Sequence, residues 1–349
     1  MPSNFYLGID VSKASLSKAS LSVVLMSSNS KVLWSSKKIA NQPSGFKQMV
    51  EHASKIASKH ADGDDYSIAA GMESTGVYGE QLSYYLADNN MSGRISLYVL
   101  NPFAVKSYRK ATMHLNKNDA ADARLIASYL ISMITTGQIT PWQAPSLAER
   151  LLRELTRRRA ELVTLREAEY NRLEKFRAGG SHPHPVIESV QELIAHLEQQ
   201  IREIDEAIEK HIDDAGLRDT AELLRSIDGI GKVSSASFIG EAGDISRYRS
   251  VKQLVSRLGI APCENQSGTS IHKKPVMSRM GSAVLRHAMY MAALVATRKN
   301  KVISAFYNRL LARGKCKKLA VIASMRKLLH IIWGVLTHGV KFDPEYAPA

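Results

Sequence analysis

The chain has 349 residues, which is too long for one ordinary hydrophobic core and predicts two or three domains. Hydrophobic residues make up 44% and charged residues 23%, a normal globular composition, and we expect no membrane-spanning or signal segment. Cysteine occurs only at Cys263 and Cys316, without metal-ligand spacing. This argues against structural zinc and a disulfide framework and predicts a cytoplasmic protein with no membrane partner.

The excess positive charge lies in the last third of the chain. Residues 220–349 contain 21 Lys/Arg and 7 Asp/Glu, a net +14, whereas residues 1–219 contain 26 of each. A basic block on a folded domain favours a polyanionic partner, most often nucleic acid. The alternative is a generic basic surface, which the motifs found there make less attractive.

The first part of the chain predicts a mixed α/β sheet. Apolar and β-branched runs predict strands at 5–11, 20–26, 31–39, 66–73 and 95–100. Amphipathic stretches between them predict helices at 44–60 and 78–88. Two strands end on an acid, at Asp10 and Glu73. The pentapeptide SKASL occurs twice, at 12–16 and 17–21. We expect this copy to lengthen the connection between the first two strands, because five residues inside a strand would invert its side-chain alternation.

Residues 117–127 are rich in Ala and Leu and predict a helix. Asp119 and Asp122 are three residues apart and so share one face of it. This pair alone is equally compatible with a cation site and with a solvated acidic first turn, which the helix dipole favours.

Asp10, Glu73, Asp119 and Asp122 would form one acidic cluster if the sheet is RNase H-like. Carboxylates this close need hard cations to stay ionised, and Mg²⁺, with Mn²⁺ as a substitute, suits oxygen ligands. Two ions about 3.5–4 Å apart would clamp the attacking and leaving oxygens of a phosphodiester. Taken singly, each strand-end acid is more simply a capping carboxylate.

The middle of the chain predicts two long helices, over 147–176 and after the break at 179–185. The second helix carries aliphatic residues at alternating spacings of three and four: Ile187, Val190, Ile194, Leu197, Ile201, Ile204 and Ile208. Such a seam is typical of a coiled coil, within one chain, between chains or both. An amphipathic helix packed on its own domain is the alternative.

The C-terminal third predicts a helix-hairpin-helix around Gly229-Ile230-Gly231, with Lys232 opening the second helix. Its backbone N–H groups would approach a phosphate, although an ordinary interhelical turn has the same pattern. Further helices are predicted at 248–258, 282–296 and 317–336, and a polar loop containing Ser267 at 263–274. The other candidate nucleic-acid contacts are Lys273, Lys274, Arg279 and Arg286.

The motifs GIDVSK, MESTGVY and KNDAADA resemble the three acidic motifs of DEDD-type bacterial insertion-sequence transposases, the Piv-related insertion-sequence-110 family. The stretches LLRSIDGIGKVSSASFIGEAGDISRY, RLGIAPCENQSGTS and SRMGSAVLRHAMYMAAL look like that family's second domain. The resemblance implies an α/β plus α fold. Its parts are an RNase H-like (RuvC-like) nuclease domain at 1–145, a coiled-coil assembly region at 146–215 and a basic helical transposase domain at 216–349.

The resemblance also implies residue roles and partners. The metal-binding acids fall on Asp10, Glu73, Asp119 and Asp122, and the serine nucleophile falls on Ser267, which nothing local would single out. The implied protein is a recombinase that cleaves and rejoins donor and target DNA through a 5′-phosphoserine. A noncoding guide RNA encoded in the element and a homo-oligomer, a dimer or a synaptic tetramer, are implied as well. One departure is Asn118, where the family usually has Thr.

Two other functions remain compatible with the residues. A junction-resolving nuclease would use water on the same acidic cluster, and a non-catalytic nucleic-acid-binding protein would retain binding without cleavage. A covalent protein–DNA adduct separates the recombinase from the nuclease.

Overall fold

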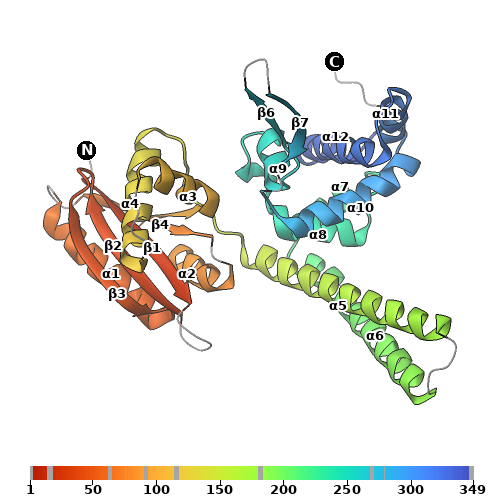
Figure 1. Cartoon of the computed structure of the whole chain (residues 1–349), viewed down its shortest axis with the longest axis horizontal. Helices are drawn as coiled ribbons and strands as arrows, with labels where there is room; N and C mark the ends of the chain where they lie inside the picture. The colour runs from red at the N-terminus through yellow and green to blue at the C-terminus, as the bar shows by residue number, and fades with distance from the viewer. Residues whose placement is uncertain are drawn as a thin grey trace. The chain divides into compact units, whose positions relative to one another are not determined.

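The structure, a computed structural model, describes residues 3–13, 19–61, 65–74, 76–89, 93–113, 118–179, 184–267, 271–278 and 280–345. At residues 3, 13, 19, 77, 262–267 and 271–276 it describes the backbone alone. The chain forms two compact units, Met1–Ala144 and Pro145–Ala349 (Figure 1).

The N-terminal unit contains a five-stranded sheet in the order β3-β2-β1-β4-β5. Its strands are β1 (Ser3–Lys13), β2 (Ala19–Ser27), β3 (Val32–Ala40), β4 (Tyr66–Glu73) and β5 (Ile95–Leu100). The first three strands pair antiparallel, and β1, β4 and β5 run parallel. The predicted mixed α/β sheet is therefore confirmed.

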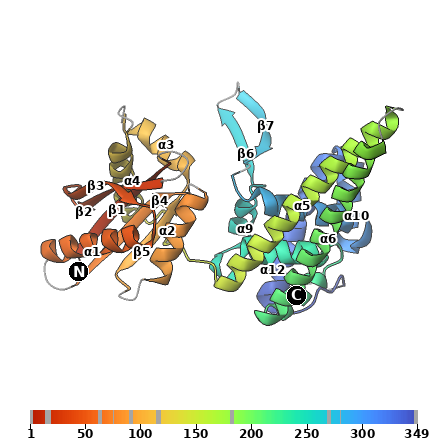
Figure 2. The same cartoon turned by 90° about the horizontal axis from the view of Figure 1, so that it is seen from below.

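Helices cover both faces of this sheet (Figure 2). Residues of α1 (Pro43–His60) and α2 (Val77–Asp88) pack with Leu7 and Ile9 of β1. On the opposite face, α3 (Pro102–Ala111) and α4 (Asp119–Thr135) pack with Tyr6. The helix α3 was not predicted, because Asn101-Pro102 was interpreted only as the end of a strand. Proline is tolerated in a first helical turn, and the Asn101 side chain accepts a hydrogen bond from the Phe103 N–H there.

The described parts of the duplicated SKASL segment, residues 12–13 and 19–21, lie on the two strands of the β1–β2 hairpin. The ladder runs without a bulge from Phe5 opposite Ser27 to Lys13 opposite Ala19, and residues 14–18 lie outside the described residues. The β1–β2 register is regular through Asp10, which lies opposite Ser22. That the duplication lengthens the connection stays a prediction.

In the C-terminal unit, α5 (Leu147–Ala178) and α6 (His184–Asp214) form a helical hairpin. The predicted seam of α6 packs against α5: Val190 and Ile194 contact Leu173, while Leu197 and Ile201 contact Leu162. These seam residues are buried within one chain.

The remaining helices share one large core. They are α7 (Arg218–Arg225), α8 (Lys232–Ala242), the 3₁₀ helix η1 (Ile245–Arg247), α9 (Val251–Arg257), α10 (Ala283–Lys299), α11 (Lys301–Ala312) and α12 (Lys317–His338). The helix predicted at 248–258 begins only at Val251, and α11 was missed because it follows α10 after the single residue Asn300, whose side chain caps it.

The helix α12 corrects the expectation that no segment is apolar and long enough to span a membrane. It has 22 residues and is long and apolar enough to cross a membrane, by length and composition alone. Its residues Leu328, Leu329 and Ile332 are fully buried in the C-terminal core, which makes the membrane signal weak.

A second correction concerns the loop predicted at 263–274. The segment forms an antiparallel hairpin of β6 (Pro262–Ser267) and β7 (Ile271–Met277). Its sequence, PCENQS and IHKKPVM, lacks the apolar alternation by which a half-buried strand is recognised. Backbone pairing therefore forms strands that a hydrophobic pattern did not predict.

Candidate nuclease site

Asp10 and Glu73 lie at the same edge of the sheet on neighbouring parallel strands. Ile9 of β1 pairs with Met72 of β4, and each acid is the next residue along its strand. Because side chains alternate, both acids face away from the α1–α2 core that contains Ile9 and Met72, and toward α4.

The start of α4 supplies the other two acids. The Asn118 side chain caps the helix by accepting a hydrogen bond from the Ala121 N–H at 2.9 Å. Asn and Thr are both favourable N-cap residues, which explains how the departure at position 118 is accommodated. Asp119 is then the first helical residue and is exposed, and Asp122 lies one turn later and is half-buried.

The charges of these four residues act on one another. Burial raises the pKa of Asp10 to about 7, together with the negative charges of Asp122, Asp119 and Glu73. Burial and the charge of Asp122 likewise raise the pKa of Glu73. The four predicted acids therefore lie within electrostatic reach of one another, which is the arrangement that favours a bound cation.

Arg109 of α3 brings a positive charge into this cluster. Its Nη2 atom lies 2.6 Å from Oδ1 of Asp122, and its charge opposes the rise in the pKa of both Asp10 and Glu73. Arg109 was not predicted as a site residue, because an arginine in an unpredicted helix has no distinguishing pattern.

The donor chemistry of the cluster fits a hard divalent ion, since the cluster offers carboxylate oxygens. The side chains do not form an assembled metal centre. Among the described residues, no three acidic, histidine or cysteine side chains converge closely enough to hold an ion.

The candidate nucleophile belongs to the other unit. Ser267 is the last residue of β6 and lies opposite Ile271, with residues 268–270 outside the described part of the chain. Lys273 and Lys274 lie on β7, the return strand of this serine hairpin (residues 262–277). Arg279 also lies outside the described residues.

The base of the serine hairpin is fixed by a network of hydrogen bonds. The Ser278 N–H donates to the Ala261 carbonyl and the Ser282 N–H donates to the Arg257 carbonyl, each at 3.0 Å. Arg286, a predicted nucleic-acid contact, donates from Nη1 to the Leu258 carbonyl at 2.7 Å. In this structure Arg286 thus completes the C-terminal end of α9.

The predicted helix-hairpin-helix consists of α7, the Gly229–Gly231 turn and α8. Gly229 has φ +106°, and a Cβ there would lie 2.7 Å from Cβ of Ala296, so this glycine is needed for the turn and for packing on α10. Gly231 has open space around it.

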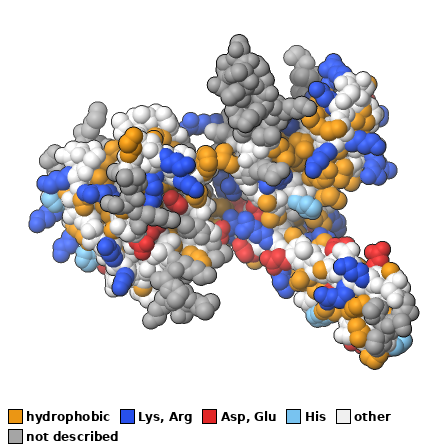
Figure 3. All heavy atoms as spheres, viewed as in Figure 1, with side chains coloured by type: hydrophobic (Ala, Val, Ile, Leu, Met, Phe, Trp, Pro, Cys, Tyr) orange, Lys and Arg blue, Asp and Glu red, His pale blue; other side chains and the backbone are white. Residues whose placement is uncertain are grey.

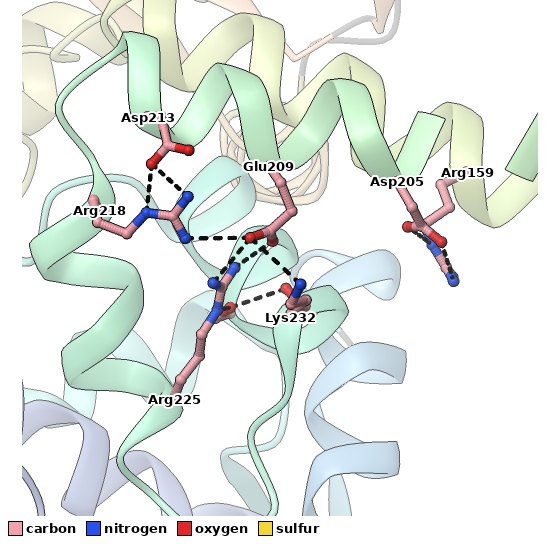
Figure 4. Close-up of polar contacts among 8 residues, drawn as sticks. Arg159, Asp205, Glu209, Asp213, Arg218, Arg225 and Lys232 are labelled. Atoms are coloured by element: carbon pink, nitrogen blue, oxygen red, sulfur yellow. Dashed lines mark hydrogen bonds and ion pairs between the residues drawn. The ribbon is translucent and has the colours of Figure 1, made fainter. Parts of the chain in front are cut away.

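Lys232 is largely exposed, and its Nζ atom lies 4.0 Å from a carboxylate oxygen of Glu209. Glu209 accepts hydrogen bonds from Arg218 and Arg225 (Figure 4).

The C-terminal unit also carries a basic stretch without acids. Residues 265–342 contain 15 Lys/Arg and no Asp or Glu. Blue side chains gather over α11 and the adjoining start of α12 (Figure 3). The exposed basic residues there include Arg298, Lys299, Lys301, Arg309, Arg313, Lys315, Lys317 and Lys318. The excess of Lys and Arg in residues 220–349 predicted a basic surface in this part of the chain. It did not predict which residues form that surface.

Comparison with known proteins gives matches along most of the chain. A DEDD-type transposase family model matches residues 7–176, and a model described as transposase IS116/IS110/IS902 family matches residues 221–308. The pilin gene-inverting proteins of Moraxella bovis and Moraxella lacunata are each 29% identical over 345 residues, covering 98% of both chains. A transposase for the insertion sequence element IS1328 of Yersinia enterocolitica is 27% identical over 154 residues, 42% of this chain and 44% of its own length.

Proposed function

Because the chain belongs to the IS110 family of insertion-sequence transposases, we propose that it cleaves and rejoins DNA with the acidic cluster and Ser267. The observation that supports this proposal is that Asp10 and Glu73 lie on neighbouring parallel strands near the start of α4, which carries Asp119 and Asp122. Burial, together with the negative charges of Asp122, Asp119 and Glu73, raises the pKa of Asp10 to about 7. An acidic cluster of this kind is suited to phosphodiester chemistry.

We further propose that the N-terminal unit is RNase H-like. Three antiparallel strands are followed by two parallel ones, and the helix that carries two acids crosses the central strand β1. This topology supports the assignment by bringing strand-end acids and helical acids to the same face.

Asp10, Glu73, Asp119 and Asp122 would hold Mg²⁺, or Mn²⁺ in its place. When bound, the ion would neutralise charge on the phosphodiester and assist the nucleophile. Asp10 and Glu73 would provide oxygen ligands from neighbouring parallel strands. Asp119 and Asp122 would provide them from the start of α4, which the Asn118 side chain caps.

Ser267 would attack the scissile phosphorus through Oγ. A new Oγ–P bond forms and the P–O3′ bond breaks. The serine hydroxyl proton passes to a base or to solvent, and the 3′ oxygen takes a proton from solvent and leaves as a hydroxyl. The 5′ end of the strand stays joined to the protein as a phosphoserine, so the phosphodiester energy is kept for rejoining. In the reverse direction a 3′ hydroxyl attacks the phosphoserine and releases Ser267.

The partners in this proposal are donor and target DNA, a noncoding guide RNA encoded in the element, and further copies of the chain. The basic stretch of residues 265–342 supports a polyanionic partner, and Gly231, Lys232, Lys273, Lys274 and Arg279 are the proposed contacts on it and beside it.

The experiment that tests the proposal is a cleavage assay with labelled DNA, resolved on a denaturing gel before and after protease digestion. RNA that co-purifies with the protein is included. We expect Mg²⁺-dependent cleavage and a protease-sensitive shift for the wild type, and neither for Ser267→Ala. We expect Asp122→Asn to abolish cleavage, because it removes the negative charge of one proposed metal ligand. Nucleic-acid binding should stay intact, because the change leaves every basic side chain in place.

Two neighbouring serines provide the matched controls. Ser270→Ala and Ser278→Ala should behave as the wild type. A shift that survives Ser267→Ala but disappears in one neighbour would reassign the nucleophile. Cleavage without any shift would indicate a water-using nuclease, and binding without cleavage would indicate a non-catalytic protein.

Site-specific inversion is a second candidate, because the chain matches the pilin gene-inverting proteins over almost its whole length. Inversion uses the same cutting and rejoining but acts between two sites on one molecule. Sequencing of rejoined products from a plasmid that carries both arrangements would show whether the segment moves or turns around.

A further inference from the structure

Arg109 touches the acidic cluster and has no role in the proposed reaction. It lies in the last turn of α3 and pairs with Asp122 of α4 at 2.6 Å, with both side chains about one-fifth exposed (20% and 21%). Its charge also acts on Asp10 and Glu73. One guanidinium therefore balances three of the four acids.

An arginine beside a candidate metal ligand can have two opposite roles. As a support, it would hold the carboxylate in the orientation that binds the ion, and its removal would weaken ion binding. As a competitor, it would occupy the oxygen and the charge that the ion needs, and its removal would strengthen ion binding. The sign of the change in affinity separates the roles.

The observations favour competition. The guanidinium contacts a carboxylate oxygen of Asp122 directly, at a distance typical of a charge-assisted hydrogen bond. While this contact is made, no three of the described acidic side chains converge on an ion position. The partial positive charge at the start of α4 also favours the negative charge of Asp122, so Arg109 is not the one source of stabilisation for this carboxylate.

We propose that Arg109 is the resident counter-cation of the acidic cluster and competes with the divalent ion for Asp122. Binding of the ion then requires Arg109 to leave Asp122, which couples the end of α3 to assembly of the metal site. The inference depends on the proposed function only in placing a divalent ion at these acids.

Calorimetric titration of the full chain with MnCl₂, without nucleic acid, tests this directly. Arg109→Gln should bind Mn²⁺ about 3–10-fold more tightly than the wild type, because an ion pair that competes for Asp122 is lost. Arg109→Lys keeps the charge and should stay close to the wild type. Lys106→Gln removes an exposed positive charge one turn away on the same helix. Because solvent and salt screen an exposed charge, this change should alter the Mn²⁺ affinity less than about twofold.

Unchanged or weaker Mn²⁺ binding by Arg109→Gln would overturn the inference. If that variant unfolds, Arg109→Met keeps the unbranched stem packed and takes its place in the same comparison. If the wild type binds Mn²⁺ and Asp10→Asn does not, the metal site stands whatever Arg109 does. Absence of Mn²⁺ binding by the wild type and by every Arg109 variant would reject the metal site and this inference together.

Discussion

A Cβ atom placed on Gly8 would lie 2.0 Å from the carbonyl oxygen of Ala123, so β1 and α4 touch backbone to backbone. Gly8 is two residues before Asp10 on β1, and Ala123 follows Asp122 on α4. The absence of a side chain at one position thus determines how closely the strand and the helix bring their acids together.

Gly8→Ala should destabilise the N-terminal unit and separate the acids. The added methyl group meets backbone atoms of Ala123 and Ala127, which cannot rotate away, and overpacking of this kind costs roughly 1–3 kcal/mol. Urea denaturation measures the loss. Gly334→Ala is the control, because Gly334 lies in α12 with open space around it, and alanine there should be neutral or stabilising by about 0.5–1 kcal/mol. Equal stability of the two variants would contradict the close contact.

Asp10 should make the ion-free protein less stable as the pH rises. In the folded chain the pKa of Asp10 is about 7, above its ordinary value of 3.8, so between these values the folded state holds a proton that the unfolded state has released. Stability therefore falls through this window. Asp10→Asn should be more stable than the wild type at pH 8 by roughly 1–3 kcal/mol, with a smaller difference at pH 5.

Urea denaturation in EDTA at pH 5, 6, 7 and 8 measures this effect. Glu51→Gln is the control, because Glu51 is an exposed acid on α1 of the same unit and should not change the pH dependence. Parallel pH profiles of stability for Asp10→Asn and the wild type would show that the charge of Asp10 does not lower the free energy of unfolding.

Local sequence patterns were sufficient to predict the strands that carry Asp10 and Glu73, because continuous apolar runs indicate buried strands. The predicted strand end near Asp10 was wrong, since β1 continues to Lys13 in its pairing with β2. Asp119 and Asp122 were placed on a shared helical face by spacing alone. The contact that brings strand and helix together was not predictable, since Gly8 and Ala123 are far apart in the chain and neither residue is distinctive alone.

Arg109 and the serine hairpin were beyond sequence reasoning for different reasons. Arg109 acts across a helix junction that was not predicted, so its partner Asp122 could not be inferred. The serine hairpin is polar on both strands, and its ladder depends on backbone hydrogen bonds that leave no hydrophobic period. The family resemblance identified Ser267 as the candidate nucleophile. Only the structure showed that Ser267 lies on a strand.

The aliphatic seam of α6 should stabilise the hairpin within one chain. Ile201 is 6% exposed and packs on Leu162 of α5, so Ile201→Asp should cost about 3 kcal/mol or more and reduce helical content on heating. Leu193→Asp is the matched control, because Leu193 on the same helix is 42% exposed and should change stability by about 0.5 kcal/mol. Circular dichroism measures the stability, and light scattering measures the mass. A drop in mass without loss of stability would show that the seam also serves between chains.

Glu241 should be the most costly acid to remove from the C-terminal unit. It is on α8, has a side chain only 1% exposed, and accepts hydrogen bonds from Arg157 of α5 at 2.6 Å and from the Ser282 hydroxyl at 2.9 Å. Burial alone would raise its pKa, but the bonds and charge of Arg157, with the Ser282 hydroxyl, hold the pKa below its ordinary value. Glu241→Ala removes the buried carboxylate that accepts both hydrogen bonds and should cost about 3–5 kcal/mol.

The exposed pair of Arg158 and Glu161 on α5 provides the comparison for Glu241. Both side chains are more than half exposed, so Glu161→Ala should cost less than about 1 kcal/mol. Because Ser282 also anchors the base of the serine hairpin through its backbone, hydrogen exchange of the Ser278 and Ser282 amides should accelerate in Glu241→Ala and stay unchanged in Glu161→Ala. Equal exchange in both variants would show that the hairpin base is held by its backbone bonds alone. Slower exchange in Glu241→Ala would show that the buried ion pair strains this base, the opposite of the role argued for it.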